Sequence, residues 1–478
     1  MFRFLPALLL STVMSLYSYA MPNTVGWHAY QTDHFVLYST KSKQAVEKIL
    51  YEFEIFRASV HNALDLKQQK TLVPVEIYIL DDPADFTYFA RNNAGYFHDT
   101  VYGPKIVVGP ERLDSLSGQT ILFHEYVHYL MRSGSGFRYP TWYNEGIAEY
   151  YSTLEIKDDH VVVGKGTIRK SLNQGSIANI NATMQQIGTH NIGDNRKRDE
   201  YYAASWLLVN FFSLSAVNDL PDYRDQLIQY LIAFNQGTNH DTAFASSFDI
   251  KMSDLKSQLK KYTRKRRLNL ARLPLPSVTV KAIESEVSPA DISRELAFLA
   301  NPSSDTGAEL MANAVSLDDG DAMAYMAIKS AGSKAAVTQQ WIDKALLSDS
   351  LSAEGLASIA IAYSTLAKYS PKSSPALLTQ SKQYFEKALA IHKLPQIHFF
   401  YPDVLWKLGL QQQAIDHIGA AIIAMPANIA VNMKAGEYMV RINNYPYARH
   451  FIGNVINWSE SSQVAKMAQA LLNLLPKK

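Results

Sequence analysis

The sequence of 478 residues contains no cysteine. Disulfide bonds, thiolate nucleophiles and cysteine metal ligands are therefore excluded, so any metal has to be held by histidine and carboxylate side chains. The net charge is only +2, which gives no overall field to attract a polyanion, and we expect no nucleic-acid partner. Beyond the N-terminus we find no apolar run long enough to span a bilayer.

The first twenty residues, MFRFLPALLLSTVMSLYSYA, have the pattern of an export signal. Arg3 precedes an apolar run, and Ser18-Tyr19-Ala20 matches a small-x-small cleavage site. The run is too short for a transmembrane anchor. The pattern predicts a signal peptide over residues 1–20, a periplasmic or secreted protein, and no transmembrane anchor after cleavage.

The rest of the chain has the composition of a folded protein with more than one domain. Hydrophobic residues make up 47% and charged residues 19%, which favours packed cores over disorder, and the length suggests about two to three domains. Strand patterns occur at 34–39, 73–80, 105–110, 154–156 and 161–163, and helix patterns at 42–64, 115–131, 142–154, 198–212 and onward to about 267. Thr141 is the predicted N-cap of the helix at 142–154. The first part of the chain is thus predicted to be α+β.

Two prolines in Ala271–Ser277 predict an extended linker, because each proline removes a backbone donor. Beyond it, helical patterns continue to the C-terminus, and Ala414, Ile418, Gly419 and Ile422 recur 34 positions later as Ala448, Ile452, Gly453 and Ile456. This spacing resembles tetratricopeptide (TPR) repeats, although the pattern is degenerate. We predict a domain over 21–270, a linker over 271–284 and an all-α, TPR-like domain over 285–478.

The run His124-Glu125-Tyr126-Val127-His128 lies in the predicted helix at 115–131. Residues i and i+4 share one helical face, so His124 and His128 can hold one metal ion with Glu125 beside them. A lone H-E-x-x-H string also arises by chance. The next helix favours the metal, because Glu145 and Glu149 are again i and i+4, and two carboxylates on one face repel unless a cation lies against them. A solvent-exposed acidic stripe is the alternative interpretation, which the neighbouring apolar and aromatic residues disfavour.

Together, these residues resemble the gluzincins, zinc peptidases in which a glutamate on the helix after H-E-x-x-H is the third ligand. The run Asn144-Glu145-Gly146 with Ala148-Glu149 is similar to their N-E-G-x-A signature. The resemblance covers about residues 27–215 and implies a thermolysin- or aminopeptidase-like zincin fold. It implies His124, His128 and Glu145 as ligands of Zn²⁺, with a fourth position open for water.

By the same resemblance, Glu125 is the general base and Glu149 orients a liganding histidine through its free nitrogen. The oxyanion donor is expected from a later helix, where Tyr201 and Tyr202 are the candidates and Tyr202 fits the pattern better; a core tyrosine is the alternative. The strand at 105–108 is either the edge that pairs with a substrate or a covered strand.

The sequence therefore predicts an exported zinc metallopeptidase that acts on a peptide or protein substrate, with TPR-like helices that bind a protein partner or position the substrate. The alternative is a catalytically inactive peptidase-fold scaffold that acts through its repeats. A structural zinc protein is a weaker alternative, since structural sites close all four positions with protein ligands, often cysteine.

Overall fold

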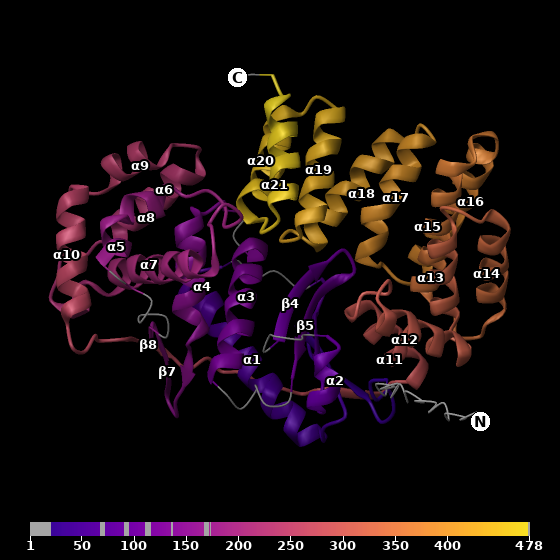
Figure 1. Cartoon of the computed structure of the whole chain (residues 1–478), viewed down its shortest axis with the longest axis horizontal. Helices are drawn as coiled ribbons and strands as arrows, with labels where there is room; N and C mark the ends of the chain where they lie inside the picture. Colours follow the sequence, from indigo (N-terminus) through magenta and orange to yellow (C-terminus); the bar gives the residue numbers. More distant parts are fainter. Residues whose placement is uncertain are drawn as a thin grey trace, which may run out of the picture.

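A computed structural model of the chain describes residues 21–66, 72–89, 95–109, 116–134, 137–166, 172 and 174–476. The predicted signal peptide, residues 1–20, lies outside the described residues. The described part is α+β, as predicted, with a small sheet and many helices toward the C-terminus (Figure 1).

The main sheet has six strands in the order β4-β5-β3-β2-β1-β9. They are β1 (His28–Gln31), β2 (Phe35–Ser39), β3 (Val75–Ile79), β4 (Gly95–Thr100), β5 (Gly103–Val108) and β9 (Ile283–Glu286). Strands β2, β3 and β5 run parallel, while β1, β4 and β9 are antiparallel to their neighbours. The edges of this sheet are β4 and β9. Strand β5, predicted to be either the edge that pairs with a substrate or a covered strand, is therefore the covered strand.

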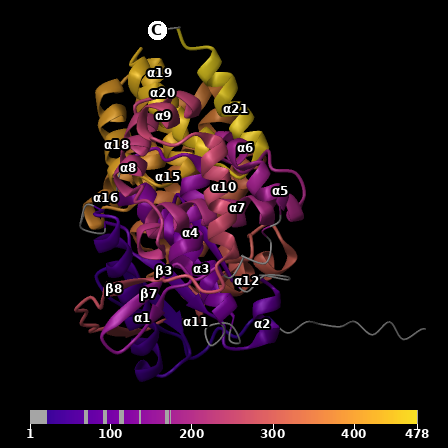
Figure 2. The same cartoon turned by 90° about the vertical axis from the view of Figure 1, so that its left-hand side faces the viewer.

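The described residues from 43 to 264 form ten α-helices. They are α1 (Lys43–Ala63), α2 (Pro83–Thr87), α3 (Leu116–Gly134), α4 (Thr141–Ser152), α5 (Gln174–Ala178), α6 (Ile180–Gln185), α7 (Asn195–Leu214), α8 (Arg224–Asn235), α9 (His240–Ser247) and α10 (Met252–Arg264). Phe86 of α2 joins the core on one face of the sheet, and the others contribute to the core on the opposite face. Side chains alternate along a strand, so Ile77 and Ile106 join the core under α1 and α3 while Tyr78 and Val107 face the other way. Helices α5–α10 form one end of the molecule (Figures 1 and 2).

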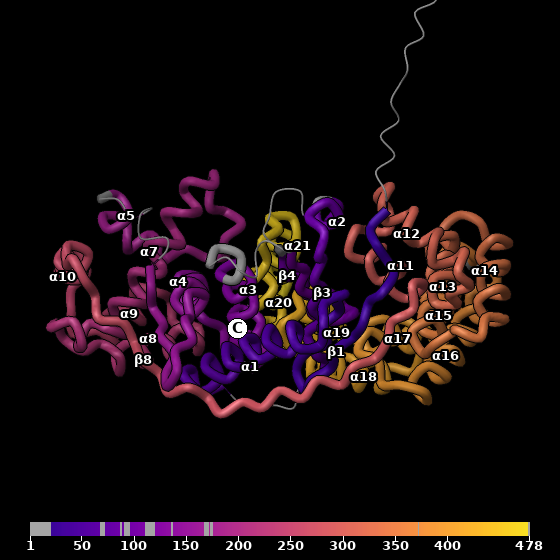
Figure 3. Tube along the Cα trace, turned by 90° about the horizontal axis from the view of Figure 1, so that it is seen from below, coloured from indigo at the N-terminus to yellow at the C-terminus, as the bar shows by residue number. Residues whose placement is uncertain are grey.

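The segment predicted as an extended linker outside any regular element, residues 271–284, contains one strand and the start of another, so that prediction was wrong in part. Residues of β8 (Ala271–Pro274) pair with β7 (His160–Val163), which itself pairs with β6 (Glu155–Ile156) in a hairpin formed by two of the predicted strands. Farther on, β9 adds to β1. Proline is tolerated because Pro274 ends its strand and both strands lie at sheet edges. The segment runs along the first part of the molecule to its far end (Figure 3).

The C-terminal part consists of consecutive helices that pack against one another. They are α11 (Pro289–Leu299), α12 (Asp305–Ser316), α13 (Gly320–Ser330), α14 (Ala335–Leu347), α15 (Ala353–Tyr369), α16 (Ser374–Ile391), α17 (Pro395–Lys407), α18 (Gln411–Ala424), α19 (Ile429–Arg441), α20 (Tyr445–Trp458) and α21 (Ser462–Asn473). Helix α20 begins 34 positions after α18, and the equivalent Ile418 and Ile452 are both buried. This offset matches the spacing found in the sequence.

These helices curve back over the first part of the molecule (Figure 1). Ile292 and Leu296 of α11 pack on the sheet face that carries Tyr78 and Val107, so one core crosses the predicted domain boundary. At the other end, α20 and α21 come to lie beside α3 and α4 (Figure 1). None of the described helices combines the length and apolar character needed to cross a bilayer.

Candidate metal centre

Helix α3 places both predicted histidines on its buried side. Its other faces carry Leu122, Val127 and Leu130, which pack into the main core, so the helix is held on several sides. His124 is 9% exposed and His128 is 5% exposed. Polar side chains buried to this degree need partners, and these partners come from α4.

Helix α4 is buried along its whole length, including Glu145 and Glu149. The acidic-stripe alternative is therefore wrong, because neither carboxylate is on the surface. Thr141 is not the N-cap, since Pro140 precedes the first helical residue. The Thr141 hydroxyl is engaged in tertiary bonds instead, accepting from the backbone N–H of Gly188 at 2.8 Å and pairing with Asn457 at 3.1 Å.

Three ligand atoms from α3 and α4 form a tight triangle. The Nε2 atoms of His124 and His128 are 3.1 Å apart, and Oε2 of Glu145 lies 3.3 Å from the first and 3.2 Å from the second. Ligand atoms around a tetrahedral zinc with bonds of about 2.0–2.1 Å are about 3.3–3.4 Å apart. The residues present thus fit a zinc ion without rearrangement, and they are the group of described residues suited to hold a metal.

Glu149 lies where the sequence predicts it. Its Oε1 atom is 3.2 Å from Nδ1 of His124, the nitrogen that does not face Glu145. Burial alone would lower the pKa of His124, but hydrogen bonds to Glu145 and Glu149 outweigh burial and raise it well above its ordinary value. Burial likewise raises the pKa of Glu145, and the two imidazoles more than reverse this and lower it. The carboxylates of Glu145 and Glu149 therefore stabilise a positive charge on or between the two imidazoles.

Glu125 and Tyr202 both lie beside this cluster. Glu125 is half-buried, and its charge acts on the pKa of His124 and of Tyr202. The ring centroid of Tyr202 is 5.9 Å from that of His124. Burial and the charge of Glu145 raise the pKa of Tyr202, so its hydroxyl stays protonated and can donate a hydrogen bond. Tyr201 is buried in the main core at 8% exposure, and its charge environment also includes Glu145.

The end of α20 and the turn after it contact α3 and the segments flanking α4, which the sequence did not predict. Asn457 donates to the backbone oxygen of Tyr139 at 2.9 Å, and the backbone oxygen of Ser459 bonds His190 at 3.2 Å. The ring of Trp458 lies under the guanidinium of Arg132 at 5.5 Å.

Glu460, which follows in this turn, has an exposed side chain that is partly surrounded by protein atoms. This partial loss of hydration and the charges of Glu125 and Glu145 raise its pKa. No sequence signal marks Glu460, because it lies more than 300 positions from these residues and outside every motif.

Comparison with known proteins assigns no family. No protein-family model matches the chain, and no curated protein matches it. The assignment of a metal site therefore depends on the residues and geometry of this chain alone.

Proposed function

We propose that the protein is an exported zinc-dependent peptidase of gluzincin type, with a zincin domain over residues 21–270 and a TPR-like domain over 285–478. The observation that carries this proposal is the buried triangle of His124, His128 and Glu145, with edges of 3.1–3.3 Å. Three protein ligands in a set of two histidines and one glutamate are typical of a catalytic zinc, whereas structural zinc takes four.

The surrounding side chains supply the remaining parts of a hydrolase. When bound, a zinc ion lowers the pKa of a water and polarises the peptide carbonyl. The Glu125 carboxylate accepts the proton of the attacking water and passes it to the leaving amine as the C–N bond breaks. The Tyr202 hydroxyl donates to the carbonyl oxygen as negative charge develops there. Glu149 fixes the ring of His124 so that Nε2 faces the ligand triangle.

The C-terminal helices are proposed to position a peptide or protein substrate. The end of α20 and the turn after it contact Tyr139 and His190 through Asn457 and Ser459, and Glu460 of this turn is close enough to Glu125 and Glu145 for their charges to act on its pKa. A substrate held on these helices would reach the zinc directly. The outer helices of the same part are proposed to bind a protein partner. Export to the periplasm or medium is proposed from residues 1–20 alone.

The test compares wild type with Glu125→Gln and with the control Glu309→Gln, an exposed glutamate on α12. All three should bind about one zinc per chain by elemental analysis. Glu125→Gln should cleave a broad peptide library at least about 10²-fold more slowly by mass spectrometry, because general-base catalysis contributes roughly that much. Equal rates would contradict the assigned base.

Two other outcomes separate the alternatives. A wild type that binds zinc and cleaves no library member would favour the inactive scaffold, in which the zincin domain only supports the helices. A folded protein that binds no zinc would refute both the proposed peptidase activity and the proposed metal site.

A further inference from the structure

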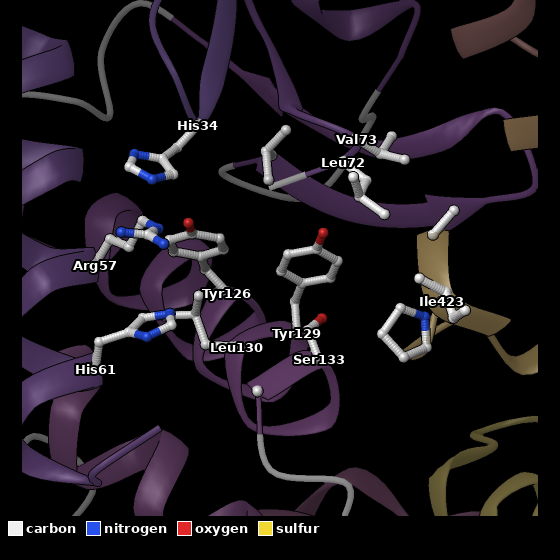
Figure 4. Close-up of a pocket in the computed structure, with 14 residues that line it drawn as sticks. His34, Arg57, His61, Leu72, Val73, Tyr126, Tyr129, Leu130, Ser133 and Ile423 are labelled. Carbon is white, nitrogen blue, oxygen red and sulfur yellow. The ribbon is translucent and has the colours of Figure 1, made fainter. Parts of the chain in front are cut away.

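A second polar site lies on the opposite face of α3 from the metal centre. It is a cavity of about 70 Å³ bounded by α1, α3, the start of β3 and the corner between α18 and α19. Six polar side chains line it (Figure 4): His34, Arg57, His61, Tyr126, Tyr129 and Ser133. Leu72 and Ile423, both exposed, form its rim.

The cavity contains a positive charge without an ionic partner. Within the part of the chain that the structure describes, Arg57 forms no ion pair. Its guanidinium lies beside the ring of Tyr126 in Figure 4. The charge of Arg57 is close enough to contribute to the low pKa of His61, together with burial. A partly buried guanidinium in this state favours an anion nearby.

His61 also has an unused polar atom in this place. The residue is 7% exposed, and its Nδ1 atom is buried without a hydrogen-bond partner among the described residues. Leaving such an atom unpaired costs free energy, so a ligand that accepts a hydrogen bond from it is favoured. The hydroxyls of Tyr126 and Tyr129 point the same way in Figure 4, and the hydroxyl of Ser133 also lines the cavity. All three can donate a hydrogen bond.

No carboxylate lines the cavity among the described residues. Two acidic residues act on the pKa of lining tyrosines, Glu54 on Tyr126 and Asp99 on Tyr129. Glu54 is held by Nδ1 of His34 at 2.9 Å and by the hydroxyl of Thr32 at 3.2 Å, and Oδ1 of Asp99 accepts from Asn428 at 3.2 Å. The lining therefore combines one cation, neutral donors and apolar walls. This combination selects an anion that accepts several hydrogen bonds and excludes a metal ion.

We propose that this cavity binds one small oxyanion of the phosphate or sulfate type, with Arg57 as its counter-charge. The cavity volume of about 70 Å³ can accommodate one small tetrahedral oxyanion. Arginine is well matched to such anions because its planar fork donates two parallel hydrogen bonds.

The position of the cavity gives the anion a structural consequence. Ile423, Ala424 and Pro426 close it from the helical part, and Val73 packs with Ala421 and Met425 beside it. Asn428 of the same corner donates to the backbone oxygen of Asp99 at 3.0 Å. A bound oxyanion would therefore join the C-terminal helices to the back of the metal helix, and it should raise the melting temperature of the whole chain.

The experiment uses the full chain, freed of metal by a chelator and desalted, so that phosphate cannot bind through zinc. Titration calorimetry and thermal melting are measured with inorganic phosphate, sulfate and acetate. The variants are Arg57→Gln, Ser133→Ala and the control Lys48→Gln, which removes an exposed positive charge from the same helix.

We expect millimolar phosphate or sulfate to bind wild type and Lys48→Gln and to raise their melting temperatures. Arg57→Gln should bind at least about tenfold more weakly, and the milder Ser133→Ala a few-fold more weakly. Ser133→Ala keeps the proposal testable if Arg57→Gln does not fold. Absence of phosphate binding to wild type, or equal binding by all variants, would overturn the proposal. Tighter binding of acetate would identify a carboxylate site instead. None of these readouts depends on peptidase activity.

Discussion

Replacing Glu149 should weaken zinc binding without unfolding the protein. Glu149 is not a ligand, and its carboxylate instead contacts Nδ1 of His124 at 3.2 Å in a buried setting. Without that contact the imidazole loses its fixed orientation and some of its basicity as a ligand. Glu149→Gln keeps an oxygen that can accept the Nδ1–H but removes the charge, while Glu149→Ala removes both.

The two substitutions should therefore differ in size. Outer carboxylates of this kind are worth about 10–100-fold in metal affinity. We expect a loss of about tenfold for Glu149→Gln and about 100-fold for Glu149→Ala, which correspond to about 1.4 and 2.8 kcal/mol of binding free energy. The alanine variant loses more because it also leaves Nδ1 of His124 buried and unpaired.

The assay is competition for zinc between the protein and a chromophoric chelator at constant pH, with circular dichroism to confirm that each variant is folded. Glu309→Ala, an exposed glutamate on α12, is the matched control and should bind like wild type. If Glu149→Ala is folded and binds zinc as tightly as wild type, the orienting role is wrong and Glu149 only fills the core.

Gly146→Ala should destabilise the protein by about 1–3 kcal/mol and weaken zinc binding, because its Cβ would lie 2.3 Å from the backbone oxygen of Ser205 and would push α4 away from α7. Gly419→Ala, whose Cβ meets nothing within 4 Å, should be neutral or stabilising, and equal melting temperatures for the two variants would refute this packing argument. The pKa of His61 is lowered to about 4 in the folded chain. Between about pH 6.5 and pH 4 the unfolded chain therefore binds a proton that the folded chain does not. The free energy of unfolding should fall by up to about 3 kcal/mol as the pH drops through this range. His61→Gln should remove this pH dependence of the unfolding free energy, measured by denaturant titrations at several pH values. An unchanged pH dependence in the variant would contradict its assignment to His61.

The local structure around the metal centre followed from short-range patterns. A helical period places His124 and His128 on one face, and the same period places Glu145 and Glu149 on one face of the next helix. Two such helices joined by a short loop are close in space, so their pairing was predictable. The α+β class and the strands at β2, β3 and β5 followed equally from short apolar segments bounded by turn residues.

The sequence-based predictions were wrong where a group expected to bond within its own segment bonds a distant segment instead. Thr141 would cap α4 in isolation, but its hydroxyl bonds Gly188 and Asn457 instead. The proline-rich segment would be an open linker in isolation, yet β8 finds a partner in the hairpin strand β7. Local propensity is a weak prior that tertiary partners override.

The sequence by itself was enough to propose the ligand set and the base, because these proposals depend on helical spacing and on chemistry available without cysteine. Only the tertiary structure decided what surrounds them. It brought Glu460 and the α20–α21 turn to the metal centre, and it assembled the Arg57 cavity from segments on both sides of the predicted linker. Contacts between residues hundreds of positions apart leave no periodic trace in the chain, because they arise from how whole elements pack and not from the spacing within any one of them.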